Sequence, residues 1–239
     1  MRSAEQKYWL SAHVHVCVTD NYAVLLDLRQ DKYIGVGREH LPALADVVAG
    51  WPRTSQPEAD SVQSSDALLS KLLGMGMLTT DSALGREAQP PSLPRPQSMA
   101  TVADLERRPP IRVRDVSRVL TAAAKAKLSL KWRPIETVVG RVQARKRERC
   151  PTGDFDLQAA YPLVEAFLHL RPLYFTTKDE CLFDSLVLVE FLARHGLYPT
   201  WVIGVSTNPF KAHSWVQVGD CVLNDLPEYV CMYTPILAI

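Results

Sequence analysis

Three side chains in the last third of the chain belong to the residue types that perform nucleophilic catalysis. Cys181 stands directly before an apolar stretch, His213 lies in PFKAHSWVQ, and Asp225 ends CVLND. A cysteine thiolate attacks carbonyl carbons, an imidazole takes the thiol proton, and a carboxylate orients the imidazole. These types in this order predict a Cys-His-Asp triad. Taken singly, each residue is more typical of a structural role.

The apolar stretch after Cys181 predicts a buried helix over Leu182–His195, ended by Gly196. A thiol at the start of this helix meets unpaired backbone N–H groups and the positive end of the helix dipole, and both favour the thiolate. The backbone N–H groups of Cys181 and Leu182 are therefore the predicted donors to an oxyanion.

Strand patterns carry the other two residues of the predicted triad. We expect strands at Thr200–Ser206, Ser214–Val218 and Cys221–Asn224, with a hairpin at Gly219-Asp220. His213 would open the second strand and Asp225 would end the third. The hairpin would then place both side chains at the same end of the sheet.

The remaining thiols offer no second reactive centre. The five cysteines contain no CxxC pair, which argues against a disulfide framework and a cysteine-rich zinc site, and we predict no metal site. Cys17 and Cys221 lie in strand patterns and are predicted to be core residues. Cys150 and Cys231 have no neighbouring base and are predicted to be structural.

The first 80 residues predict a small module of a different kind. Three strand patterns and about three short helices resemble a winged-helix-like arrangement. The strands are predicted at Tyr8–Thr19, Tyr22–Leu28 and Lys32–Val36, and the two clearest helices at Leu41–Ala49 and Asp66–Leu73.

A proline-rich segment and a basic segment separate the two parts. Residues 81–110 are predicted to be a linker, and six prolines between Gly85 and Pro110 favour a solvated tether. Residues 111–149 have helical patterns interrupted at Pro134. Residues 81–149 contain 16 basic and 7 acidic side chains, net +9, between segments of net −2 and −6. We therefore expect residues 111–239 to form a second domain that starts with basic helices.

The composition is that of an ordinary globular protein. The 239 residues are 47% hydrophobic and 22% charged, with a net charge of +1, which excludes a disordered or collagen-like chain. No run of 18 uncharged apolar residues and no signal-peptide pattern is present, so we expect a cytoplasmic protein that does not enter a membrane. The predicted fold class is α+β.

The runs CLFDSLVLVEFLARHG, WVIGVSTNPFKAHSWVQ and VLNDLPEYV carry a resemblance to a known family. Over Ile111–Ile239 the chain resembles the C-terminal domain of lasso peptide biosynthesis B proteins, transglutaminase-like cysteine proteases that remove the leader from a precursor peptide. The resemblance implies a papain- or transglutaminase-like fold. It also implies that Cys181 is the nucleophile, His213 the base and Asp225 the orienting acid.

The N-terminal module resembles the PqqD-like leader-recognition domain of the same pathway, through its strand-strand-strand-helix order, its aliphatic helix and its terminal GML. The resemblance implies that the leader binds as an added β-strand, with backbone hydrogen bonds for affinity and apolar pockets for specificity. The implied leader-binding residues are Lys32, Tyr33, Ile34, Gly35, Val36, Leu68, Leu69 and Leu72.

The resemblance implies two partners, the precursor peptide and an asparagine-synthetase-like lasso cyclase, and it implies dependence on ATP. No GxxxxGK[ST] loop is present, so no cofactor is predicted to bind this chain and any nucleotide is expected on the cyclase. Two alternatives remain open. The same triad could serve a transglutaminase or acyltransferase, or the basic segment and a winged helix could bind nucleic acid. The acidic flanking domains and the lack of interleaved aromatic residues argue against nucleic acid.

Overall fold

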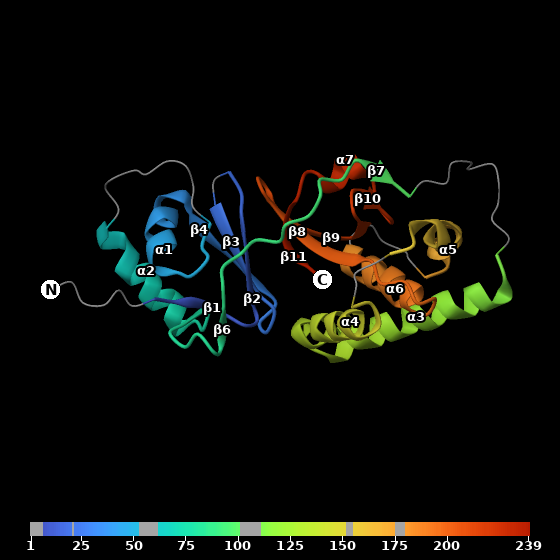
Figure 1. The fold of residues 1–239 in the computed structure, drawn as a ribbon, viewed down its shortest axis with the longest axis horizontal. Helices are drawn as coiled ribbons and strands as arrows, with labels where there is room; N and C mark the ends of the chain where they lie inside the picture. The colour runs from blue at the N-terminus through green and yellow to red at the C-terminus, as the bar shows by residue number, and fades with distance from the viewer. Residues whose placement is uncertain (1–6, 21, 53–61, 101–110, 152–154, 175–179) are drawn as a thin grey trace. The chain divides into compact units, whose positions relative to one another are not determined.

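A computed structural model describes residues 7–20, 22–52, 62–100, 111–151, 155–174 and 180–239 (Figure 1). The chain divides into two compact units. The N-terminal unit comprises Met1–Pro91 with Thr207–Pro209, and the C-terminal unit comprises Ser92–Ser206 with Phe210–Ile239.

Two small sheets build the N-terminal unit. One is an antiparallel meander in the order β2-β3-β4, made of β2 (Val14–Val18), β3 (Tyr22–Asp27) and β4 (Lys32–Gly37). The other has the order β5-β1-β6, made of β1 (Trp9–Ser11), β5 (Leu78–Thr79) and β6 (Gly85–Arg86). The helical elements are η1 (Arg38–His40), α1 (Leu41–Val47) and α2 (Val62–Gly74).

The first predicted strand, Tyr8–Thr19, is wrong as a single element, because the chain changes sheets inside it. The Ser11 N–H donates to Met77 O at 2.9 Å, whereas His13 O accepts from the Leu28 N–H at 3.1 Å. The sheet β5-β1-β6 was not predicted, because β5 and β6 are each two residues long and are too short to show an alternation of apolar and polar residues.

The expected solvated tether is wrong for residues 85–100, and residues 101–110 lie outside the described part of the chain. β6 pairs with β1, and the Ala88 N–H donates to Ala49 O at 2.8 Å. Further along, β7 (Ser98–Met99) pairs in parallel with β10 of the C-terminal unit. Backbone hydrogen bonds to distant strands order this segment, and a proline-rich composition gives no sign of them.

The C-terminal unit is built on a five-stranded sheet in the order β11-β8-β9-β10-β7. Its other strands are β8 (Thr200–Thr207), β9 (Phe210–Val218), β10 (Cys221–Val222) and β11 (Thr234–Ala238). The helical elements are α3 (Val113–Trp132), α4 (Ile135–Arg149), α5 (Leu157–Leu170), η2 (Arg171–Leu173), α6 (Cys181–Ala193) and α7 (Pro227–Val230).

α6 is the central helix of this unit and lies between the sheet and α3 (Figure 1). Every residue from Asp184 to Leu192 is buried, as expected of a largely apolar helix in the interior of a domain. Gly196 ends the segment with a φ of +76°, which confirms the predicted left-handed residue after the helix. The first residue of α6 is therefore held by a rigid, buried element.

The basic helices α3 and α4 are part of the C-terminal unit. Lys125 of α3 and Arg145 of α4 both bind the buried carboxylate of Glu190 on α6, at 2.7 and 2.8 Å. Lys146 donates to Pro199 O at 3.2 Å. Part of the positive charge therefore neutralises a buried acid and binds the backbone before β8, and it requires no external ligand.

The hairpin at Gly219-Asp220 is confirmed, since Cys221 pairs with Val218 across it and Gly219 has a φ of +55°. The predicted strand boundary was wrong, because β9 begins at Phe210 and His213 lies inside it. α7 and β11 were not predicted.

The mixture of helices and strands confirms the α+β class. Within the described residues, no helix combines the length and the apolar character needed to cross a bilayer.

Candidate active site

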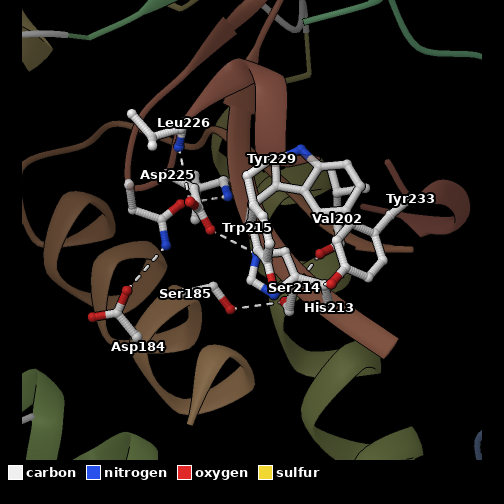
Figure 2. A network of polar contacts seen from close by, with 12 residues as sticks. Asp184, Ser185, Val202, His213, Ser214, Trp215, Asp225, Leu226, Tyr229 and Tyr233 are labelled. Atoms are coloured by element: carbon white, nitrogen blue, oxygen red, sulfur yellow. Dashed lines mark hydrogen bonds and ion pairs between the residues drawn. The ribbon is translucent and has the colours of Figure 1, made fainter. Parts of the chain in front are cut away.

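The three residues of the predicted triad line one cavity of about 640 Å³ in the C-terminal unit. Cys181 is the first residue of α6, His213 lies on β9, and Asp225 follows β10. His213 Nε2 and Asp225 Oδ2 are 2.6 Å apart, and Asp225 Oδ1 accepts from the Leu226 N–H at 2.8 Å (Figure 2). The fold thus joins residues that are up to 44 positions apart in the sequence.

The surroundings of Cys181 favour its charged form. Burial by itself would raise the pKa of the thiol, but a hydrogen bond with His213, the charge of that ring and the backbone groups of Ser214 and Leu182 outweigh burial, so the pKa is lowered. The backbone of Leu182, predicted to face an oxyanion, therefore also interacts with the sulfur.

The imidazole of His213 is held in its protonated form. Burial opposes the charge, but the hydrogen bond to Asp225 and the interaction with Cys181 raise the pKa of His213 to about 9. A lowered thiol pKa beside a raised imidazole pKa favours the thiolate–imidazolium form of the pair.

Aromatic rings enclose this imidazole on several sides. The ring centroids of Tyr229 and Tyr233 lie 5.0 Å from that of His213, and Trp215 stacks on it at 6.1 Å with an interplanar angle of 18° (Figure 2). The Tyr233 hydroxyl donates to the Tyr229 hydroxyl at 3.0 Å. These rings restrict the imidazole to an orientation in which it meets both Asp225 and Cys181.

A buried hydroxyl network joins the helix of Cys181 to the strand of His213. Ser185 Oγ and Ser214 Oγ are 2.8 Å apart, and Trp201 Nε1 donates to both at 2.9 and 2.8 Å. Ser214 Oγ also donates to Val202 O at 2.9 Å. The hydrogen bonds connect α6, β8 and β9 without any charge.

A second polar group lines the same cavity and was missed by the sequence analysis. Asp184 is fully buried and receives two bonds from Arg171, Nε to Oδ1 and Nη2 to Oδ2, both 2.9 Å long. The side chain of Asn224 donates to Asp184 Oδ2 at 3.1 Å. The available signals were the spacing of Asp184 three residues after Cys181, which places both on one helix face, and the Asn-Asp pair at 224–225.

The other thiols lie outside this cavity. Cys17 and Cys221 are buried, which confirms both as core residues, and burial raises the pKa of Cys17 to about 12. Cys150 and Cys231 are partly buried. Within the described ranges, no cluster of three or more His, Cys, Asp or Glu side chains is suited to hold a metal.

The predicted leader-binding residues lie in the N-terminal unit. β4 is an edge strand, since it pairs with β3 and with no other strand in the described part of the chain. Val36, Leu69 and Leu72 are core residues of this unit, with exposed fractions of 2%, 8% and 1%. Leu69 and Leu72 therefore offer little surface to a leader, and their place in a groove stays a prediction. The predicted residues with accessible surface are Lys32, Tyr33, Ile34, Gly35 and Leu68.

Comparison with known proteins identifies the superfamily to which the C-terminal part of the chain is similar. Residues 120–238 match the family model of the transglutaminase-like superfamily. A 51-residue segment is 46% identical to "Microcin J25-processing protein McjB" of Escherichia coli, and this segment is 21% of the chain and 24% of that relative. No solved structure matches the chain significantly.

Residues 120–238 thus form a transglutaminase-like domain, in which a buried helix carries the cysteine, the sheet beside it carries the histidine, and the turn after β10 carries the acid. The two matches also confirm the resemblance to lasso peptide biosynthesis B proteins. The matched segment spans about a quarter of the length of the curated relative.

Proposed function

We propose that the C-terminal unit is a cysteine peptidase that cleaves a leader from a precursor peptide. The observation that carries this proposal is the convergence of Cys181, His213 and Asp225 in one cavity, with the electrostatics of a thiolate–imidazolium pair. A pre-formed thiolate attacks a peptide carbonyl without waiting for a separate base to remove its proton.

The proposed reaction runs in two halves. The Cys181 sulfur attacks the scissile carbonyl carbon, and the oxyanion is stabilised by backbone N–H groups at Cys181 and Leu182. The imidazolium of His213 donates its proton to the leaving amine as the C–N bond breaks, which leaves a thioester. Water then attacks the thioester while His213 takes up one of its protons. The leader leaves as a carboxylic acid, and the thiolate and imidazolium are restored.

The substrate class follows from the resemblance and from the relative's name, which describes McjB as a processing protein for microcin J25. We assign this chain the corresponding step for a lasso precursor in the cytoplasm, with the freed core passing to an asparagine-synthetase-like cyclase. ATP is assigned to the cyclase.

Leader binding is assigned to the free edge of β4. An edge strand offers a row of backbone groups to an extended peptide. Tyr33 and Ile34 are partly buried on this strand, and Leu68 of α2 is also partly accessible. These side chains would supply the apolar pockets.

The deciding experiment replaces Cys181 by Ala in the full chain and follows a synthetic precursor by mass spectrometry. We expect loss of cleavage with retained leader binding, because the variant lacks the nucleophile and keeps β4. Cys150→Ala is the matched control, a partly buried thiol outside the cavity that should cleave at the normal rate. Continued cleavage by Cys181→Ala would overturn the proposal.

Acyl transfer is the second candidate, since the superfamily is named for transglutaminases. It shares the attack by Cys181 and differs in the group that releases the thioester. A product mass showing amide formation with an added amine, rather than the free acid, would favour transfer over hydrolysis.

A further inference from the structure

Three elements must keep a fixed spacing for the triad to work, namely α6 with Cys181, β9 with His213, and the turn after β10 with Asp225. Asn224 contacts all three. It directly precedes Asp225, its Oδ1 accepts from the Val216 N–H on β9 at 2.9 Å, and its Nδ2 donates to Asp184 on α6 at 3.1 Å. Its exposed fraction is 3%, so water does not compete for these bonds.

Asp184 is in turn held by a second element. The guanidinium of Arg171 on η2 donates hydrogen bonds to both carboxylate oxygens of Asp184. These bonds fix the orientation of the carboxylate, with Oδ2 toward the amide of Asn224. Asp184 and Cys181 lie three residues apart on one face of α6, and both line the catalytic cavity with Arg171 and Asn224. Figure 2 shows Asp184 and Asp225 among the residues of one network of polar contacts.

We propose that Asn224 is a positioning residue, and that the Arg171–Asp184 pair anchors it so that His213 and Asp225 stay in register with Cys181. The catalytic benefit of this positioning rests on the proposed peptidase function. The positioning itself is inferred from the hydrogen bonds of Asn224 and Asp184 alone. An amide suits this position because it donates to one carboxylate while accepting from a backbone N–H. A second carboxylate there would meet Asp184 at hydrogen-bond distance and repel it.

Exchanging the two side chains provides the test. Asn224→Asp alone places two carboxylates together. Combined with Asp184→Asn it restores one amide and one carboxylate at positions 184 and 224, but it removes one of the two hydrogen bonds that Arg171 donates to position 184. The readout is the pH dependence of Cys181 alkylation by iodoacetamide in the full chain, measured by peptide mass spectrometry. This readout needs no peptide substrate, so it tests the geometry even if the chain proves not to be a peptidase.

We expect Asn224→Asp to slow Cys181 alkylation at neutral pH by about 10-fold or more and to lower kcat for the precursor by a similar factor. The reason is that a small displacement of a catalytic group lowers the reaction rate strongly. The double exchange removes the repulsion between the two carboxylates but weakens the Arg171 anchor, so it should recover both rates only in part, a coupling typical of residues in one network. Where Asn224→Asp fails to fold, Asn224→Ala removes both contacts without adding charge and is expected to give the same loss.

Glu190→Gln is the matched control, since Glu190 is another buried carboxylate of α6 held by basic side chains, outside the cavity. It should lower the melting temperature and leave the alkylation profile unchanged. An unchanged profile in both Asn224 variants would overturn the proposal.

Discussion

The reactivity of Cys181 depends on two opposing influences on its thiol. Burial disfavours the charge, while His213 and nearby backbone groups favour it, and the second influence prevails. For His213, burial lowers the pKa of the ring, and the interactions with Asp225 and Cys181 together outweigh burial. Asp225 therefore contributes to the charge of the imidazole as well as contacting the ring.

The charge states predict a bell-shaped dependence of kcat/KM on pH. Activity falls on the acid side as Cys181 takes up its proton, and on the alkaline side as His213 loses its proton near its pKa of about 9. In Asp225→Asn the carboxylate that raises the pKa of His213 is gone, so the alkaline limb should move to lower pH. We also expect kcat to fall about 10²–10⁴-fold, by analogy with the acid of serine protease triads.

Steady-state rates with a fluorogenic precursor between pH 5 and about 10 check this prediction. Glu190→Gln serves as the control, since it removes a carboxylate from the same unit without touching the triad. An unshifted alkaline limb in Asp225→Asn would show that another group sets the charge of His213.

Residues 92–100, which precede the basic helices, form part of the C-terminal unit, although the sequence predicted a solvated tether there. β7 extends the catalytic sheet beside β10, and Ala100 N–H donates to Val222 O at 2.7 Å. Pro94 O accepts from the buried side chain of Gln217 at 2.8 Å, and Leu93 packs against the core cluster around Trp215. This stretch belongs to the C-terminal unit, although its sequence resembles a tether.

A fragment of residues 92–239 should therefore be more stable than one of residues 111–239. The shorter fragment loses the β7 pairing, the Gln217 bond and the packing of Leu93. At about 1 kcal/mol for each hydrogen bond, its melting temperature should fall by roughly 10 °C. Thermal unfolding followed by circular dichroism measures the difference. Equal melting temperatures would mean that β7 adds no stability.

For the whole molecule, the proposed division of labour assigns leader affinity to the N-terminal unit and cleavage to the C-terminal unit. Two sites on one chain raise the local concentration of a tethered substrate. The two units have separate cores, each with its own buried residues, as expected if each contributes a distinct activity.

Labelled leader peptide should bind residues 1–91 and the full chain with similar affinity, and residues 92–239 far more weakly. For cleavage, residues 92–239 alone should show a KM raised by about 10²-fold and a kcat that changes little, because only substrate capture is lost. Fluorescence anisotropy and cleavage kinetics supply the two measurements, with a scrambled leader as the control. Equal leader affinity of residues 92–239 would contradict the assignment.

Local patterns in the sequence were enough to predict the helix behind Cys181, the hairpin at Gly219-Asp220 and the break at Pro134, since each depends on neighbouring residues. Side-chain chemistry and order were enough to select Cys181, His213 and Asp225 as candidates. These features need only periodicity, turn propensity and the known reactivity of three side chains.

Contacts between distant segments required the tertiary structure. The pairing of β7 with β10, the role of Lys125 and Arg145 at Glu190, and the burial of Leu69 and Leu72 depend on which elements pack together. The same holds for Asn224, an ordinary amide in the sequence that contacts three elements in the fold. Burial and hydrogen bonds across long sequence separations leave no periodic trace in the chain, so only the folded arrangement reveals them.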